Sequence, residues 1–328
     1  MSRKSFFLLV LCVIAIIVAY RIFGKDFNWD LFLSSLSKMK AGWLAASVAL
    51  TMVTYWLRAV RWQVLLAPLK AVPLRPLLSI TIVGFSAIFL LGRAGEFARP
   101  LWLTRREKVA LTGSVATIVV ERVLDMIMLI LAFGIALVVS DVTTSATLIQ
   151  LQSKAWMVAA FAGGALIALF VLRSHGAWVV RLIPIKRVAS WADSFLQGLS
   201  FLRDGRSLAL VALQSALLWL GIALQFWTML LGMNFTFSMT EATLVMVGAA
   251  IGSVAQIPGI GGGFQAGYIF CMTALLRVPL EQAVATSLIA TVFSFVPTVL
   301  VTPLFMLGQD FSLKDLKGSI IKPESEAV

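Results

Sequence analysis

Three charged residues at helical spacing stand deep inside a long apolar stretch of this sequence and could bind a charged ligand. Glu121 and Asp125 are four residues apart with Arg122 between them, so a helix would carry both carboxylates on one face. A charge at the bilayer centre costs about 2.5–3.5 kcal/mol. These groups must therefore face the protein interior, paired with one another or with the basic residues of a first hairpin expected at about residues 77–104. Such a cluster can bind or couple to a substrate, or it can serve only as an ion-pair clamp between helices.

A second group of charged residues stands at a glycine-rich break, where residues 92–100 read GRAGEFARP. A helix beginning near Gly95 would place Glu96 and Arg99 on one face, where they can pair. Arg93 would remain at the break, free to meet a phosphate oxygen, which suits its planar guanidinium group. The alternative is a boundary cluster that faces water. Because charges beside a helix break in a membrane usually mark a pathway, we favour the binding role.

A second glycine-rich break, residues 258–267 (PGIGGGFQAG), carries no charge. Consecutive glycines would present bare N–H groups at the start of a helix near Phe264, a geometry that attracts anions. Gln265 could hydrogen-bond a substrate or bridge two helices. The GxGxxA pattern in this stretch follows no strand, so we reject a nucleotide-binding fold. The candidate binding residues of this break are Pro258, Gly259, Gly261, Gly262, Gly263 and Gln265.

The composition indicates what kind of protein must position these residues. The chain is 60% apolar and 13% charged, whereas soluble domains are roughly 45–50% apolar and about 25% charged. The net charge of +12 comes from basic residues that flank apolar spans, which is typical of the positive-inside rule rather than of nucleic-acid binding. Cys12, Cys271 and the single histidine, His175, exclude a Cys/His zinc site. We expect no metal and no cofactor.

The sequence predicts an all-α polytopic membrane protein with one membrane domain, residues 1–307, and a polar cytoplasmic tail, residues 308–328. Both termini are expected in the cytoplasm, and the inner cell membrane is the expected location. Arg58 and Arg61 lie near the end of the second expected span, where we expect them to snorkel to cytoplasmic headgroups, with direct ligand contact as a weaker alternative. The six expected crossings are residues 6–19, 41–66, 109–139, 155–172, 208–231 and 283–307.

Two further apolar stretches are too short for a crossing and are expected to form re-entrant hairpins. Residues 77–91 number only 15, against the roughly 20 that a crossing helix needs. A full crossing would also leave the basic residues that follow outside. We therefore expect a hairpin at about 77–104 that enters from the cytoplasm and another at about 242–276 that enters from outside. Two oppositely entering hairpins, each followed by one span, are typical of an inverted repeat.

These residues carry a resemblance to the flippase-like membrane family named after the transmembrane region of lysylphosphatidylglycerol synthase. The family's Gly-x-x-Gly-Glu motif with a following arginine is matched at residues 92–99, and its Glu-Arg-x-x-Asp motif at residues 121–125. Its Pro-Gly-Gly-x-Gly-x-x-Glu motif is matched at residues 258–265, with Ile260 in place of a glycine and Gln265 in place of the acid. The resemblance implies a protein that moves or accommodates a lipid between leaflets. The change at Gln265 removes a titratable group, which argues against proton coupling there.

The sequence as a whole favours a flippase or transporter of an anionic or polyprenyl-type lipid, with membrane lipids as its partners. The full synthases of the family carry a soluble aminoacyl-transfer domain, whereas only the polar residues 308–328 follow the last expected span. We therefore expect no enzyme activity and no catalytic residues. Two alternatives stay open. One is a membrane-embedded transferase with Glu96, Glu121 or Asp125 as base, and the other is an accessory subunit of an envelope-lipid pathway.

Overall fold

The computed structural model describes residues 27–37, 39–139, 204–255 and 262–306, together with isolated positions between 156 and 196. All regular elements of these residues are helical. Five helices are long and apolar enough to cross a membrane: α3 (Ala41–Leu66), α4 (Leu74–Leu91), α6 (Leu111–Val139), α10 (Gly205–Gly232) and α13 (Leu280–Met306). The prediction of an all-α, multi-pass membrane protein is confirmed. The expected crossing at 6–19, most of that at 155–172, and the tail at 308–328 lie outside the described residues.

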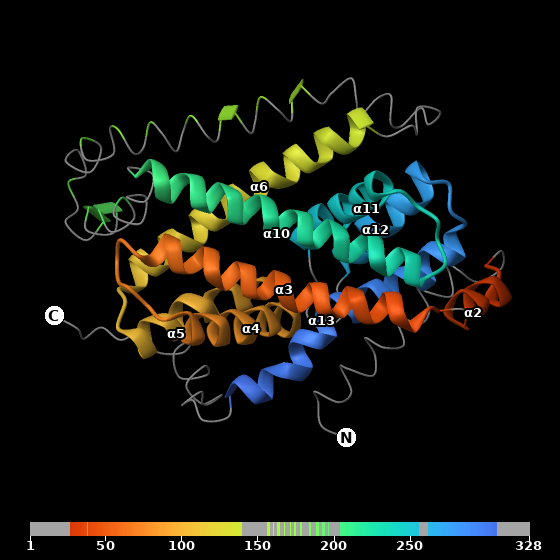
Figure 1. Ribbon diagram of the computed structural model, residues 1–328, viewed down its shortest axis with the longest axis horizontal. Helices are drawn as coiled ribbons and strands as arrows, with labels where there is room; N and C mark the ends of the chain where they lie inside the picture. The colour runs from red at the N-terminus through yellow and green to blue at the C-terminus, as the bar shows by residue number, and fades with distance from the viewer. Residues whose placement is uncertain are drawn as a thin grey trace.

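Helices α3 (Ala41–Leu66) and α10 (Gly205–Gly232) run antiparallel side by side (Figure 1). At one end the Lys40 N–H donates to the Gly232 carbonyl, and toward the other end Arg61 donates to Ser215. Asp204 caps the N-terminus of α10, and its carboxylate accepts hydrogen bonds from the first turn. The hydrogen bond from the Ser207 hydroxyl lowers the pKa of the Asp204 carboxyl.

The first glycine-rich break turns the chain back on itself. Helix α4 (Leu74–Leu91) ends at Gly92, whose φ of 66° lies in the region that favours glycine. The chain continues as η1 (Gly92–Phe97) and α5 (Ala98–Glu107). A Cβ added at Gly95 would lie 2.4 Å from the carbonyl oxygen of Ala87, so η1 packs directly on the backbone of α4.

The prediction that the helix before this break is too short to cross the membrane is wrong. Helix α4 starts at Leu74 rather than at residue 77 and has 18 residues. Pro76 does not prevent this start, because the first turn of a helix needs no N–H donor from its own residues. Helix α4 is therefore long enough to cross, and the re-entrant path of this hairpin stays a prediction.

The second hairpin pairs α11 (Met239–Gly252), extended by η3 (Ser253–Ala255), with α12 (Gly263–Phe270) and its continuation η4 (Cys271–Leu275). Glycines line the contact between the two helices. A Cβ at Gly252 would lie 2.0 Å from the Gly263 carbonyl oxygen, and one at Gly267 would lie 1.9 Å from that of Gly248. The two backbones therefore touch, as in other small-xxx-small contacts between membrane helices.

Helix α13 (Leu280–Met306) joins the two hairpins. Its Phe295 stacks on Phe89 of α4 at 5.0 Å and meets Phe264 of α12 edge-on at 5.2 Å between ring centroids. The described chain thus has the order span, broken hairpin, span twice: α3 with α6 (Leu111–Val139) around the first hairpin, and α10 with α13 around the second. The antiparallel relation of α3 and α10 is what an inverted repeat requires.

Candidate functional site

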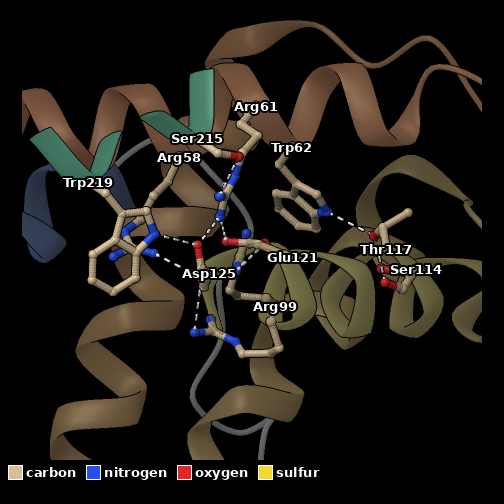
Figure 2. Close-up of polar contacts among 11 residues, drawn as sticks. Arg58, Arg61, Trp62, Arg99, Ser114, Thr117, Glu121, Asp125, Ser215 and Trp219 are labelled. Carbon is tan, nitrogen blue, oxygen red and sulfur yellow. Dashed lines mark hydrogen bonds and ion pairs between the residues drawn. The ribbon is translucent and has the colours of Figure 1, made fainter. Parts of the chain in front are cut away.

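Glu121 of α6 is the centre of a buried group of charges (Figure 2). Its Oε2 receives a hydrogen bond from Arg99 Nη1 at 3.0 Å, and its Oε1 lies 3.3 Å from Arg61 Nη2. Glu121 and Arg61 have fully buried side chains, and that of Arg99 is 1% exposed. Because Arg61 comes from α3 and Arg99 from α5, this carboxylate ties a span and the first hairpin to α6.

Asp125 lies one helical turn further along α6, and its two carboxylate oxygens have different partners. Oδ1 lies 2.8 Å from Arg61 Nη2 and accepts a hydrogen bond from the Trp219 indole at 3.3 Å. Oδ2 lies 3.5 Å from Arg122 Nη1 and 3.7 Å from Arg58 Nη1. The side chains of Arg58 and Arg122 are 13% and 36% exposed. Oδ1 thus contacts the fully buried Arg61 and the Trp219 indole, whereas Oδ2 contacts the two more exposed arginines.

Aromatic rings contact two of the arginines. The guanidinium of Arg99 lies 4.3 Å from the Trp62 ring centroid and 5.4 Å from that of Phe85, and the guanidinium of Arg58 lies 4.8 Å from Phe85. The Trp62 indole donates to Thr117 on α6 at 3.0 Å. These cation–π contacts stabilise desolvated guanidinium groups where hydrogen-bond acceptors are few.

Arg99 reaches Glu121 because Gly84 of α4 leaves room for it. A Cβ at Gly84 would lie 2.2 Å from Cγ of Arg99. A larger residue at position 84 would therefore collide with the arginine side chain.

Positive charge is in excess in this cluster. Four guanidinium groups surround two buried carboxylates, and half-buried Glu96 interacts electrostatically with Arg122. Even with Glu96 included, the described side chains of the cluster carry one more cation than anions. Several of their buried nitrogens have no hydrogen-bond partner among the described residues: Arg58 Nη1, Arg61 Nε, Arg99 Nε and Nη2, and Arg122 Nε. The site can therefore accept an anion.

The burial and pairing expected for Glu121 and Asp125 are confirmed, since Glu121 is fully buried and Asp125 is 7% exposed. The expectation that Arg58 and Arg61 snorkel to the membrane surface is wrong for Arg61, which is fully buried, whereas the side chain of Arg58 is 13% exposed. The cause is tertiary, because α10 covers this face of α3 with Ser215 and the acids of α6 face it.

Other predicted binding residues lie apart from the cluster or outside the described part of the chain. The side chain of Arg93 and residues Pro258, Gly259 and Gly261 fall outside it. Gly262 precedes α12 with a φ of 52°, and half-buried Gln265 lies in the first turn of α12.

No described contact joins Gly262, Gly263 or Gln265 to the arginines. The part of the chain that the structure describes also contains no group of His, Cys, Asp and Glu side chains placed to hold a metal ion.

Sequence reasoning did not identify the supporting residues of the cluster. Ser215 and Trp219 of α10, Phe85 and Gly84 of α4, and Trp62 of α3 carry no motif. The only available signal was Trp62, which directly follows an intramembrane arginine.

The family described as the lysylphosphatidylglycerol synthase TM region matches residues 7–302, which include both hairpins and every member of the cluster. The chain belongs to this family. Membership in the lysylphosphatidylglycerol synthase TM region family makes it a membrane domain associated with lipid-related functions. Comparison with curated proteins finds no match, and comparison with solved structures finds none.

Proposed function

We propose that this protein binds the anionic headgroup of a membrane lipid at the arginine cluster and moves that lipid between leaflets. The observation that carries the proposal is that four guanidinium groups surround Glu121 and Asp125. Both acids and three of the four arginines lie on helices that can cross a membrane. A lipid phosphate supplies the missing negative charge. Guanidinium groups suit it, because they present several N–H donors in a fixed plane.

A purely structural clamp accounts for only part of this arrangement. Arg61, Arg99 and Glu121 are buried and close, as a clamp between helices requires. Arg58 and Arg122 are more exposed, and both approach a single carboxylate oxygen at longer distances. Further uncompensated cations inside a membrane are costly, and charges that are kept there usually mark a substrate pathway.

Binding and transport agree with the geometry better than catalysis does. A general base must be free to take a proton from the substrate. The carboxylates of Glu121 and Asp125 are both held by guanidinium groups, so neither is free in this arrangement. We therefore propose that the protein is not an enzyme, that the two hairpins are re-entrant, and that both termini lie in the cytoplasm of an inner-membrane protein.

Reconstitution into liposomes tests the proposal. Fluorescently labelled phosphatidylglycerol and phosphatidylcholine are supplied, and the fraction reaching the outer leaflet is measured by chemical quenching. Phosphatidylglycerol is expected to move faster with the protein than without it, and faster than phosphatidylcholine. A double variant, Arg58→Gln with Arg122→Gln, is expected to move phosphatidylglycerol about tenfold or more slowly than wild type. This is the effect of removing ~1.4 kcal/mol or more of binding free energy.

The matched control is Arg105→Gln with Arg106→Gln, which removes the same charge from two exposed positions at the end of α5. This variant is expected to keep the wild-type rate. Equal rates for the two lipids, no protein-dependent movement of any anionic lipid, or conversion of the lipid to a new product would each contradict the proposal.

A further inference from the structure

The two acids of the cluster are held differently, and the difference concerns the part of the site that is open. Glu121 has no exposed side-chain surface and lies between two arginines that are themselves buried. Asp125 is 9% exposed at its side chain, and its Oδ2 contacts only Arg58 and Arg122 among the described ion pairs. The exchangeable part of the cluster is therefore at Oδ2.

The distances at Oδ2 are those of a loose contact. Charge-assisted N–H···O bonds are typically about 2.7–2.9 Å long, whereas Oδ2 lies 3.5 Å from Arg122 Nη1 and 3.7 Å from Arg58 Nη1. Arg58 Nη1 and Arg122 Nε are also buried without a hydrogen-bond partner. One carboxylate oxygen is thus shared between two cations whose donors remain available.

The other carboxylate oxygen of Asp125 is held firmly. Oδ1 lies 2.8 Å from Arg61 Nη2 and accepts the Trp219 N–H. Asp125 can therefore give up its contacts at Oδ2 while it stays anchored through Oδ1. The anchor comes from α3 and α10, whereas Arg122 belongs to α6 itself.

We propose that Asp125 is an internal counter-ion whose Oδ2 is replaced by a phosphate oxygen of the lipid headgroup between Arg58 and Arg122. This inference rests on the proposed function and names the two residues that hold the phosphodiester and the group that competes with it. In the empty site Oδ2 is the counter-ion that the two arginines share. In the occupied site the phosphate takes this role, and Oδ2 moves back to release the lipid.

The exchange predicts that removing the internal competitor tightens lipid binding. Asp125→Asn keeps an oxygen for the contact with Arg61 and the hydrogen bond from Trp219 but removes the negative charge. The wild-type protein and this variant are purified in a neutral detergent. Binding of dihexanoyl-phosphatidylglycerol and of dihexanoyl-phosphatidylcholine is measured by native mass spectrometry.

Asp125→Asn is expected to bind dihexanoyl-phosphatidylglycerol about tenfold or more tightly than wild type, the effect of ~1.4 kcal/mol of relieved competition. Its binding of phosphatidylcholine should change much less, because that headgroup brings its own cation. In liposomes the same variant should move phosphatidylglycerol more slowly at saturating lipid, because release now lacks the competing carboxylate.

Asp125→Glu tests the exchange without changing the charge, and it serves where the asparagine variant fails to fold. Its longer side chain brings the carboxylate further toward Arg58 and Arg122. It should therefore compete better and weaken binding of dihexanoyl-phosphatidylglycerol several-fold. The matched control for Asp125→Asn is Glu107→Gln, which also removes one negative charge, but from the end of α5. It should leave binding of dihexanoyl-phosphatidylglycerol unchanged.

The outcomes separate this inference from the proposed function. If the wild-type protein binds neither lipid, the proposed function is wrong. If it binds phosphatidylglycerol, but Asp125→Asn and Asp125→Glu both bind it as wild type does, only the exchange is overturned. A gain in Asp125→Asn that is equal for the two lipids also overturns the exchange, because it shows no competition between anions.

Discussion

The two hairpins use missing side chains in different ways. In the first hairpin, the absent Cβ of Gly84 makes room for the side chain of Arg99, which passes on to Glu121. In the second, the absent Cβ atoms of Gly252 and Gly267 let one helix backbone touch another. Glycine therefore makes room for a buried charged side chain in the first hairpin, whereas in the second it allows two helix backbones to pack in direct contact.

This difference also bears on where an anion can bind. The first hairpin brings a guanidinium group into the membrane-spanning bundle. At the start of α12 in the second hairpin, Gly263 lies against the carbonyl oxygens of Gly252 and Ala255. Carbonyl oxygens repel an anion. The prediction that the second break binds an anion has therefore less support than the same prediction for the first.

The largest effect is expected for Glu121→Gln, which tests whether the first hairpin is held by charge. The change leaves Arg61 and Arg99 buried without their shared counter-charge. Breaking a buried ion pair by removing one partner costs about 3–5 kcal/mol. The free energy of unfolding, measured by denaturant titration in mixed micelles, should fall by that amount.

Glu107→Gln is the matched control for this prediction. Glu107 lies in the same hairpin and pairs with Arg106 at 3.6 Å, with both side chains partly exposed. Such a surface pair is worth about 0–1 kcal/mol. Equal effects of the two substitutions would show that the buried cluster does not hold the hairpin.

The next largest effect is expected for Gly252→Ala in the second hairpin. The added methyl group would meet the Gly263 carbonyl at 2.0 Å, and neither backbone can rotate away. Overpacking of this kind costs about 1–3 kcal/mol, and we expect the upper end of that range. Gly134→Ala in α6, where nothing lies within 4 Å of an added Cβ, is the control and should be neutral or stabilising.

Gly84→Ala should destabilise the first hairpin less but disturb its chemistry more. The added methyl group meets Cγ of Arg99 at 2.2 Å, and a side chain can yield where a backbone does not. We expect a loss of about 2 kcal/mol in unfolding free energy. The displaced arginine should also weaken binding of dihexanoyl-phosphatidylglycerol, whereas Gly252→Ala should leave that binding near wild type. The opposite order of effects on lipid binding would contradict the assignment of roles to the two hairpins.

The spans were predictable because apolar length determines them. The expected span at 41–66 has the bounds of α3, and that at 109–139 differs from α6 only at its first residues. The start of α4 was not predicted, because the apolar run begins only at Leu77, after Pro76. Proline is compatible with the first turn of a helix, so composition alone placed this boundary three residues too late.

The sequence predicted only those features of the site that follow from the energetic cost of exposing a charge to lipid. Burial of Glu121 and Asp125 followed from the penalty for a charge that faces lipid. Pairing with a basic residue of the first hairpin was also predicted, and Arg99 confirms it. Arg61 was not predicted as a partner, because it reaches the acids through the packing of α3 against α6. Arginines near helix ends usually snorkel, and Arg61 is an exception because α10 covers it with Ser215. The relation between separate helices is not visible in the spacing along any one of them.

The smallest effect is expected at the point where the second hairpin begins. Ser238 and Glu241 form a capping box, in which the Ser238 hydroxyl accepts the Glu241 N–H at 3.3 Å and Glu241 Oε2 accepts the Ser238 N–H at 2.8 Å. The first hairpin starts at Pro73 without a side-chain cap. Ser238→Ala should therefore cost about 1 kcal/mol in unfolding free energy, whereas Ser238→Thr keeps the hydroxyl and should cost little.

Hydrogen exchange of the first-turn amides of α11 measures the effect of Ser238→Ala, and faster exchange confined to this turn is expected. If exchange also accelerates across the glycine contact with α12, the packing of the second hairpin depends on how α11 starts, and the contact between backbones is not sufficient to hold it.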